Sequence, residues 1–419
     1  MSFIIQPTQP ITDPQDIPVT LTADSSAPMY ASLSYTFTIT DLDSYVTYTL
    51  TATNGTVSRS GGTITYTPAS SGPGGFIING RTVSLTISAN PSPSYLLFGG
   101  GGSAGRGSPS GGGGAGGYLA GSGTVTPGSP YTITIGAGGA GSQASYQAGN
   151  PGSTTSFGAN SVIGGAGGAG EQAYATSGGA SGGGGSSGGP AQYATASAGT
   201  SGLGFAGGNA IFYSGGGGGA SSIGIDGTSV NTGGIGGDGY VESTLYPTVT
   251  SSTSQTIGTG SKTFTVASGL QYVANQNIRI GNGSNYMYGL VTSYSTTSLV
   301  VSISFVSGSG TFASWTINNM FAGGGGGGGH NIYGIQGGRG GTGNVSASGG
   351  QTNGNAALAG TAGGGGGGGY ANWTGGGGGS GCVIIRVSGA ANATTGSPSV
   401  CIDGAFYIYT FTASGTITF

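Results

Sequence analysis

The residues that could perform covalent chemistry are few in this chain of 419 residues, and they are scattered along it. Ser–His–Asp catalysis needs an acid and a nucleophile gathered around a histidine, and nothing marks such partners for the single histidine, His330. Hydrolysis of glycosides needs two carboxylates about 5–10 Å apart. The acidic residues between positions 99 and 381 form no motif, and they are Glu171, Asp226, Asp238 and Glu242. We therefore expect that the protein is not an enzyme.

The stretch Gly258-Thr-Gly-Ser-Lys262-Thr263 has part of the composition of a phosphate-binding loop. In that motif a glycine directly precedes the lysine, and a helix follows whose N-terminal amides hold the phosphate. Here Ser261 precedes Lys262, and the residues that follow have the pattern of a strand. We therefore expect no nucleotide and no other cofactor.

Residues that could hold a metal ion are also sparse. Asp41 and Asp43 could supply oxygen ligands to calcium, but a solvated β-turn is the simpler interpretation of this pair. Cys382 and Cys401 do not have the spacing of a zinc site, and one histidine cannot complete such a site. Each cysteine lies in an apolar strand pattern, which favours two free buried thiols, although a disulfide between them stays open. We expect no metal ion.

Aromatic side chains beside glycine or other small residues carry the most information about function. Their neighbours suit the tips of loops, where aromatic rings stack on sugar faces and anchor protein interfaces at low entropic cost. The alternative is that these rings plug or cap a glycine core. The candidates for contact with a receptor, together with His330, are Tyr118, Tyr146, Tyr174, Tyr193, Phe212, Tyr213, Tyr333, Tyr370 and Trp373.

The elements that would position these side chains are dominated by glycine, which makes up 101 of the 419 residues. Gly323–Gly329 and Gly363–Gly369 are uninterrupted runs. Gly/Ser linkers usually stay coils, because glycine loses the most backbone freedom when it is ordered. Here the runs are interrupted by apolar pieces such as Ile211-Phe-Tyr213, and only four charges lie between Gly99 and Val241, which favours packed structure over a tether.

Side-chain-free backbone can form an extended helix with three residues per turn, and such helices can lie close together. Each N–H and C=O then points outward to a neighbour, and weak Cα–H to carbonyl contacts add cohesion. The chain has no strict Gly-X-Y period, which excludes collagen. We therefore predict polyglycine-II-like stacks of extended glycine helices whose tips carry the aromatic residues.

The remaining sequence predicts an all-β protein with essentially no α-helix. Alternating, β-branched stretches such as Tyr35–Thr40 and Val83–Ser88, separated by turn signals such as Asn54-Gly55, are typical of a β-sandwich. Strand patterns return where the glycine content falls after residue 243. The predicted domains are an immunoglobulin-like sandwich (1–90), a first glycine-rich block (91–243), a small inserted β barrel or sandwich (244–320), a second glycine-rich block (321–388) and C-terminal β-strands (389–419).

Composition excludes several functional classes. Charged residues make up 4% of the chain and the net charge is −3, so it lacks the basic stripe that binds nucleic acid. No run of about 18 apolar residues occurs, so we expect no membrane insertion. The segment Met1–Pro7 has neither a basic region nor an apolar core of signal-peptide length, which fits a particle that is assembled inside a cell and released by lysis.

Several strand-like segments resemble the glycine-rich tail-fibre or adhesin proteins of tailed bacteriophages of the marine-phage type. The first glycine block carries 95–102 (YLLFGGGG) and 125–139 (VTPGSPYTITIGAGG), and later segments are 381–386 (GCVIIR) and 411–419 (FTASGTITF). In the inserted domain, 258–266 and 307–317 resemble another module of phage fibres. The resemblance covers roughly three quarters of the chain.

The resemblance implies a virion protein, an external appendage that contacts the host. We expect a tail fibre or adhesin that binds a host cell-surface glycan or outer-membrane protein non-covalently through loops on a glycine-rich scaffold. The N-terminal domain would attach to other virion proteins. The alternative is a structural or decorating fibre of the head, neck or tail without receptor specificity. A homotrimer and a monomer are both compatible with the sequence, which identifies neither the receptor nor the host.

Overall fold

The computed structural model describes residues 2–5, 19–23, 29–40, 50–78, 81–107, 109–142, 146–171, 174–186, 195–227, 232–329, 337–341, 344, 349–350, 353–369 and 373–419. The described residues contain strands, turns and extended segments but no helix, as the sequence predicts. The chain divides into two compact units, Met1–Ser92 with Thr124–Ser129, and Pro93–Gly123 with Pro130–Phe419. The possible turn at Asp41 and Asp43 lies outside the described residues.

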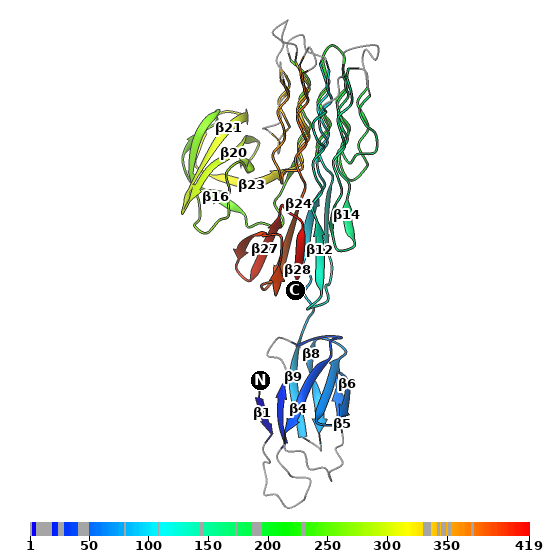
Figure 1. The fold of residues 1–419 in the computed structure, drawn as a ribbon. Helices are drawn as coiled ribbons and strands as arrows, with labels where there is room; N and C mark the ends of the chain where they lie inside the picture. Colours follow the sequence, from blue (N-terminus) through cyan, green and yellow to red (C-terminus); the bar gives the residue numbers. More distant parts are fainter. Residues whose placement is uncertain are drawn as a thin grey trace, which may run out of the picture. The chain divides into compact units, whose positions relative to one another are not determined.

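The first unit is a β-sandwich of two sheets around one apolar core (blue in Figure 1). The Phe37 and Phe76 rings, one from each sheet, meet edge to face with centroids 5.3 Å apart. The Tyr66 hydroxyl donates a hydrogen bond to the carbonyl of Thr53 at 2.7 Å and accepts one from the Gly75 N–H at 2.9 Å, which links the sheets. The immunoglobulin-like topology stays a prediction.

The strands of the sandwich follow in the order of each sheet. One sheet contains β1 (Ser2–Ile5), β2 (Val19–Ala23), β4 (Tyr35–Thr40), β7 (Thr63–Pro68) and β6 (Gly55–Ser60), and the other contains β3 (Met29–Tyr30), β9 (Arg81–Ser88), β8 (Gly72–Ile78) and β5 (Leu50–Thr53). All neighbouring strands are antiparallel except β3 and β9, which are parallel.

Two five-stranded sheets, here called the base sheets, anchor the second unit. In sheet order, one contains β11 (Tyr118–Ser122), β10 (Ser94–Phe98), β24 (Cys382–Ser388), β27 (Phe406–Phe411) and β26 (Ser399–Asp403). The other contains β14 (Asn160–Val162), β13 (Thr155–Phe157), β12 (Pro130–Thr134), β28 (Gly415–Thr418) and β25 (Ala393–Thr394). Both glycine blocks and the C-terminal segment contribute strands to this one unit. Four segments compared with known fibres in the sequence analysis pair directly, because β10 pairs with β24 and β12 with β28.

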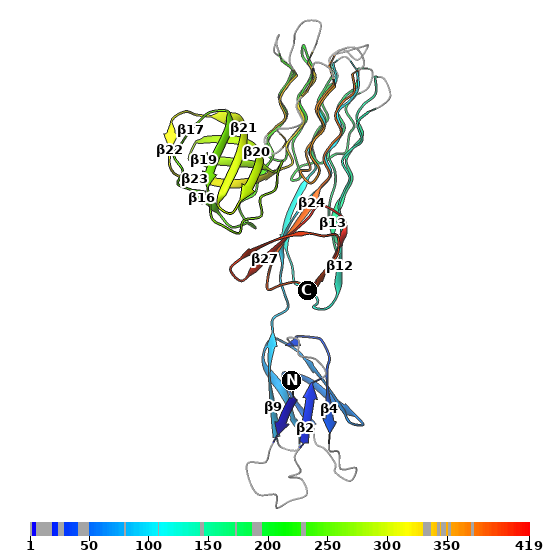
Figure 2. The same cartoon turned by 60° about the vertical axis from the view of Figure 1, so that its left-hand side comes forward.

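The inserted β domain forms a curved sheet around its own apolar core (Figure 2). The Trp315 ring lies at the centre, is 1% exposed, and donates its Nε1–H to the Thr253 carbonyl at 2.9 Å. The sheet contains β15 (Tyr240–Val241), β23 (Trp315–Phe321), β19 (Asn277–Asn282), β20 (Asn285–Ser295), β21 (Ser298–Ser307) and β18 (Gly260–Thr265), while β16 (Val249–Ser251) also pairs with β23 and β17 (Gln255–Thr256) pairs with β22 (Thr311–Phe312). The segment compared with a phosphate-binding loop therefore runs into strand β18.

Between these elements the chain runs in extended glycine segments, here called the glycine stack, which Figure 1 shows lying side by side. Segment 110–117 shows how they join, because every third residue in it donates to the same neighbour. The N–H groups of residues 111, 114 and 117 donate to 163–169, those of 112 and 115 to 215–218, and those of 113 and 116 to 362–365. The carbonyls of 111, 114 and 117 accept from 99–105, those of 112 and 115 from 181–184, and those of 110 and 113 from 325–328. A helix of three residues per turn produces this repeat.

Glycine is required inside the stack because neighbouring backbones approach so closely. A methyl group at Gly113 would come within 2.1 Å of the Gly102 carbonyl oxygen, and one at Gly364 within 1.9 Å of the Gly113 carbonyl oxygen. A backbone hydrogen bond contributes a net ~0.5–1.5 kcal/mol, which is similar to the ~1–2 kcal/mol cost of ordering a residue. The stack is therefore near balance by itself and needs an apolar anchor.

That anchor lies at the base of the stack. A buried cluster combines Leu96 and Phe98 of β10 with Phe321 and Ile384, and alanines from four glycine segments complete it. These alanines are Ala115, Ala220, Ala322 and Ala362. The Phe98 and Phe321 rings stack with centroids 4.7 Å apart, which joins the first glycine block to the second.

Candidate functional site

The end of the stack away from the base sheets is here called the distal end, and it includes Arg106, Tyr146, Glu171, Tyr174, Phe212 and Trp373. Backbone hydrogen bonds between antiparallel segments show which residues lie at this end. Beside strands β10 and β11, the Gly99 N–H donates to the Gly117 carbonyl at 2.9 Å. Six residues further from the sheets, Gly105 donates to Gly111 at 3.3 Å. Figure 1 shows the segments continuing upward from these strands.

Backbone hydrogen bonds fix one corner of the distal end around Arg106. The Arg106 N–H donates to the Gln147 carbonyl at 2.9 Å, and the Glu171 N–H donates to the Arg106 carbonyl at 3.3 Å. Tyr146, next to Gln147, has a φ of 65°, which side-chain-bearing residues rarely adopt, and its side chain is half-buried. The ladders therefore bring Tyr146 and Glu171 to the same level of the stack.

Phe212 and Tyr213 occupy a tight turn of the distal end. Both of their N–H groups donate to the Gly227 carbonyl, at 2.9 and 3.0 Å, and Gly227 itself donates to Asn209 at 2.9 Å. The Phe212 side chain is 61% exposed, whereas Tyr213 is half-buried. An exposed ring on a backbone held by hydrogen bonds is arranged for contact at low entropic cost.

Two further candidates are exposed. Trp373 is 37% exposed, and its carbonyl lies beside Gly368, near the end of a seven-glycine run. Tyr174 is 67% exposed, and Thr176 two residues later donates its N–H to the Gly167 carbonyl at 3.0 Å. The fold therefore presents Tyr174, Phe212 and Trp373 to solvent from segments that are anchored to the stack.

Tyr118 is placed differently from the loop tip that its glycine neighbours suggest. It opens strand β11 at the base, and its ring packs against Tyr240 with centroids 4.9 Å apart and against the buried base cluster. It therefore follows the alternative interpretation, in which a ring caps the glycine core. Four candidates lie outside the described residues, namely Tyr193, His330, Tyr333 and Tyr370.

Several exposed apolar residues on the flank of the stack were not among the sequence candidates. Phe205, Ile223 and Ile225 are 45%, 56% and 50% exposed, and Ile211 beside the Phe212 turn is 41% exposed. Two neighbouring segments carry them, because Gly224 donates its N–H to the Ala206 carbonyl at 2.9 Å. The pattern Ile223-Gly-Ile225 could have indicated these exposed residues from the sequence. Surrounding glycine offers no apolar core in which both isoleucines could be buried.

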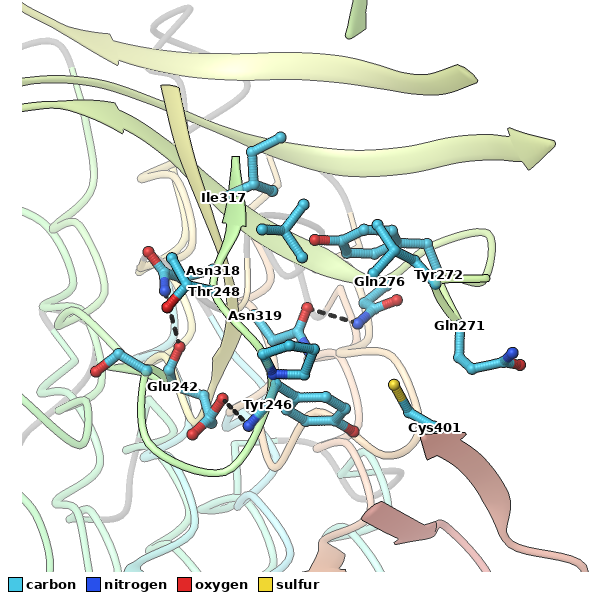
Figure 3. A pocket seen from close by; sticks show the side chains of 14 residues that line it. Glu242, Tyr246, Thr248, Gln271, Tyr272, Gln276, Ile317, Asn318, Asn319 and Cys401 are labelled. Carbon is cyan, nitrogen blue, oxygen red and sulfur yellow. Dashed lines mark hydrogen bonds between the residues drawn. The ribbon is translucent and has the colours of Figure 1, made fainter. Parts of the chain in front are cut away.

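A small cavity lies where the glycine stack meets the β domain (Figure 3). The buried Glu242 carboxylate accepts N–H hydrogen bonds from Thr244 and Leu245, both at 2.6 Å, and from Tyr246 at 3.3 Å. The Gln276 amide donates to Asn319 Oδ1 at 2.7 Å on the opposite wall. The cavity holds about 30 Å³, which is the space of one water molecule, so Glu242 shapes the turn into the β domain rather than a ligand site.

Both cysteines of the second unit are free and buried. Burial raises the pKa of the Cys382 thiol and, together with nearby Asp403, that of Cys401. A thiol with a raised pKa stays protonated at neutral pH and is a poor nucleophile. Burial likewise raises the pKa of the Tyr246 hydroxyl, which is hydrogen-bonded to Thr410 Oγ1.

Within the described ranges, no cluster of three or more His, Cys, Asp or Glu side chains has the arrangement to hold a metal ion. Over the same residues, no helix has the length and apolar character needed to cross a membrane.

Comparison with known proteins gives one match. A family model described as a glycine-rich domain matches residues 77–388, which include most of the glycine stack and the whole inserted β domain. No curated protein and no solved structure matches the chain.

Proposed function

The chain belongs to the glycine-rich domain family, and from this premise we propose that it is a virion fibre or adhesin of a tailed bacteriophage. It binds the host cell surface non-covalently, without catalysis, through the distal end of the glycine stack. The observation that carries the proposal is the set of exposed aromatic residues Tyr174, Phe212 and Trp373: the backbone of Phe212 is held by its own hydrogen bond, and the other two lie within two residues of hydrogen-bonded positions.

The architecture separates stiffness from recognition. Stiffness comes from backbone hydrogen bonds inside the stack, so side chains at the distal end are free to contact a partner. Each exposed ring offers a flat apolar face, which suits the face of a sugar or an apolar patch on an outer-membrane protein. Single contacts of this kind are weak, and many copies on one particle provide avidity. The N-terminal sandwich attaches the protein to other virion proteins.

A second candidate function is a structural or decorating virion fibre without receptor specificity. The exposed flank residues Phe205, Ile223 and Ile225 favour it, because a lateral apolar surface suits packing between fibre proteins. The two functions assign the partner contact to different surfaces, the distal end in one case and the flank in the other.

Two multiple variants of the purified full chain distinguish these surfaces. In the distal variant, Tyr174→Ser, Phe212→Ser and Trp373→Ser remove the exposed rings. The matched flank variant combines Phe205→Ser, Ile223→Ser and Ile225→Ser. We expect the distal variant to bind host cells at least about tenfold more weakly in a sedimentation assay, because aromatic anchors contribute ~1–2 kcal/mol each.

The flank variant should bind like the wild type, and both should keep the wild-type melting temperature, because exposed side chains contribute little to stability. Undiminished binding by a folded distal variant would overturn the adhesin proposal. Loss of incorporation into particles by the flank variant alone would favour the structural fibre.

A further inference from the structure

A second, larger hollow, here called the junction groove, adjoins the small cavity and shares Tyr246, Gln271 and Gln276 with it. It has a volume of about 430 Å³, within the usual ~300–1,000 Å³ of small-molecule sites. Three elements form its walls, namely the β domain, glycine segment 358–361 and the C-terminal strands. The residues that line it include Val273, Asn275, Gln276, Phe321, Leu358 and Ser399.

None of the residues that line the junction groove carries a charge. A charged ligand would lose water without gaining a counter-ion, which makes its transfer into the groove costly. Hydroxyl and carboxamide groups dominate the polar part of the lining, and they both donate and accept hydrogen bonds. The lining therefore favours a neutral ligand with many hydroxyl groups over an ionic one.

Several polar side chains at the rim are available to a ligand. Asn275, Ser399 and Thr412 are exposed, and no hydrogen bond to another described residue occupies their side chains. Asn275 is held in place by its backbone, which has a φ of 69° and donates to the Val291 carbonyl at 2.8 Å. The rim can therefore bind without first breaking internal hydrogen bonds.

Other polar groups are oriented by the fold. Gln276 accepts a hydrogen bond from the Val273 N–H at 3.1 Å and donates to Asn319 Oδ1 at 2.7 Å, so its amide has a fixed direction. The Tyr246 hydroxyl is hydrogen-bonded to Thr410 Oγ1, which joins the stack side of the groove to strand β27. A groove with such fixed groups pays less entropy when a ligand binds.

The interior of the groove is apolar. Phe321 and Met320 are 8% and 2% exposed, and Leu358 and Val273 extend this surface toward the rim. A pyranose ring has the matching division, with hydroxyl groups around its edge and C–H groups on its face. We propose that the junction groove binds a neutral saccharide of one or two rings.

This site is separate from the distal end and does not depend on the proposed receptor contact. None of the residues that line the groove belongs to the distal end. Loss of the distal aromatic residues should therefore leave saccharide binding unchanged.

Saturation-transfer NMR on the full chain tests the proposal. The probes are methyl α-glucoside, methyl α-galactoside, maltose and lactose, with glucuronic acid as the charged counterpart. We expect saturation transfer to at least one neutral saccharide and none to glucuronic acid. The dissociation constant for the best neutral probe then serves as the reference for variants.

Three variants locate the binding. Asn275→Gly removes the amide while glycine keeps the positive φ, and Ser399→Ala removes one hydroxyl. Each should weaken binding about two- to tenfold, the effect of one net hydrogen bond. Ala359→Trp places a large ring in the groove and should abolish binding. The control Asn392→Gly, an exposed position outside the groove, should bind like the wild type.

The distal triple variant separates this site from the proposed receptor site, since it should lose host binding and keep saccharide binding. Absence of transfer to every neutral probe would overturn the inference. So would preferential transfer to glucuronic acid, undiminished binding by the folded Ala359→Trp variant, or loss of binding in the distal variant.

Discussion

The glycine stack and the inserted β domain lie in one unit but achieve rigidity in opposite ways. The β domain buries large side chains, with Trp315, Phe264 and Ile280 at 1%, 0% and 0% exposure. The stack has almost no side chains inside, and its segments are joined by backbone hydrogen bonds that change partner with a period of three residues. The β domain therefore depends on the side chains that fill its core, whereas the stack depends on positions without side chains, where backbones can approach closely.

This difference determines where each region tolerates change. In the β domain, surface positions can vary while the core cannot. In the stack, closely approached glycines such as Gly113 and Gly364 cannot accept even a methyl group, whereas residues at the distal end are limited only by the turns they form. The stack is therefore suited to present variable side chains on a constant scaffold.

Removing volume should damage the β domain most. Trp315→Ala should lower the free energy of unfolding by about 3–5 kcal/mol, because it leaves a cavity and an unfilled hydrogen bond to Thr253. Urea denaturation followed by tyrosine and tryptophan fluorescence measures this change. Ile402→Ala, at a position that is 60% exposed, is the control and should change it by less than about 0.5 kcal/mol. A small effect of Trp315→Ala would mean that the β domain is not held by its core.

Adding volume should damage the stack. Gly113→Ala should lower the free energy of unfolding by about 1–3 kcal/mol or more, because the new methyl group would overlap the Gly102 carbonyl oxygen, which is itself closely packed. Amide hydrogen exchange along 110–117 and its neighbours reports the loosening. Gly123→Ala, where no atom lies within 4 Å, is the matched control and should be neutral. Equal tolerance at both glycines would contradict a close-packed stack.

The contact surface between the glycine stack and the β domain, here called the seam, should contribute least to stability. Arg339→Ala removes the contact with Phe305 and should cost about 0.5–2 kcal/mol, the range for a cation–π pair that is partly shielded from water. Burial lowers the pKa of the Arg339 guanidinium, because the charged group loses water. This loss of hydration offsets part of the stabilisation that the contact with Phe305 provides. Calorimetry should then show the β domain melting before the stack.

Arg279→Ala is the control for the seam, since Arg279 lies 4.9 Å from the Tyr286 ring centroid within the β domain. It should leave the two regions melting together. A single unchanged transition in Arg339→Ala would show that other contacts hold the seam.

The sequence predicted the strands and the stack, but not how the stack is assembled. Apolar runs such as Tyr95–Phe98 and Cys382–Val387 marked the base strands, and the long glycine runs indicated packed extended helices. Which segments would become neighbours was not readable, because glycine has no side chain to specify a partner. That 110–117 contacts both 163–169 and 362–365 follows from the anchoring strands, not from the runs themselves.

The candidate site was predicted in part for a similar reason. Glycine neighbours suggest a loop tip for Phe212, which is exposed in a distal turn, and for Tyr118, which is packed at the base. The two sequences look alike locally, and only the pairing of β11 with β10 distinguishes them. Glu242 belonged to no motif, and its role in shaping the turn at residues 244–246 depends on burial that only the fold provides.

The threefold rotation of hydrogen-bond partners has a consequence for how this scaffold can change in length. An insertion of three residues in each of the two glycine segments that a distal turn joins returns every following N–H to its original neighbour and moves that turn outward by about 9 Å. An insertion of one or two residues would turn all following donors toward the wrong neighbours. Reach can therefore grow only in whole turns, and each such step corresponds to nine nucleotides in the coding sequence of each of the two segments.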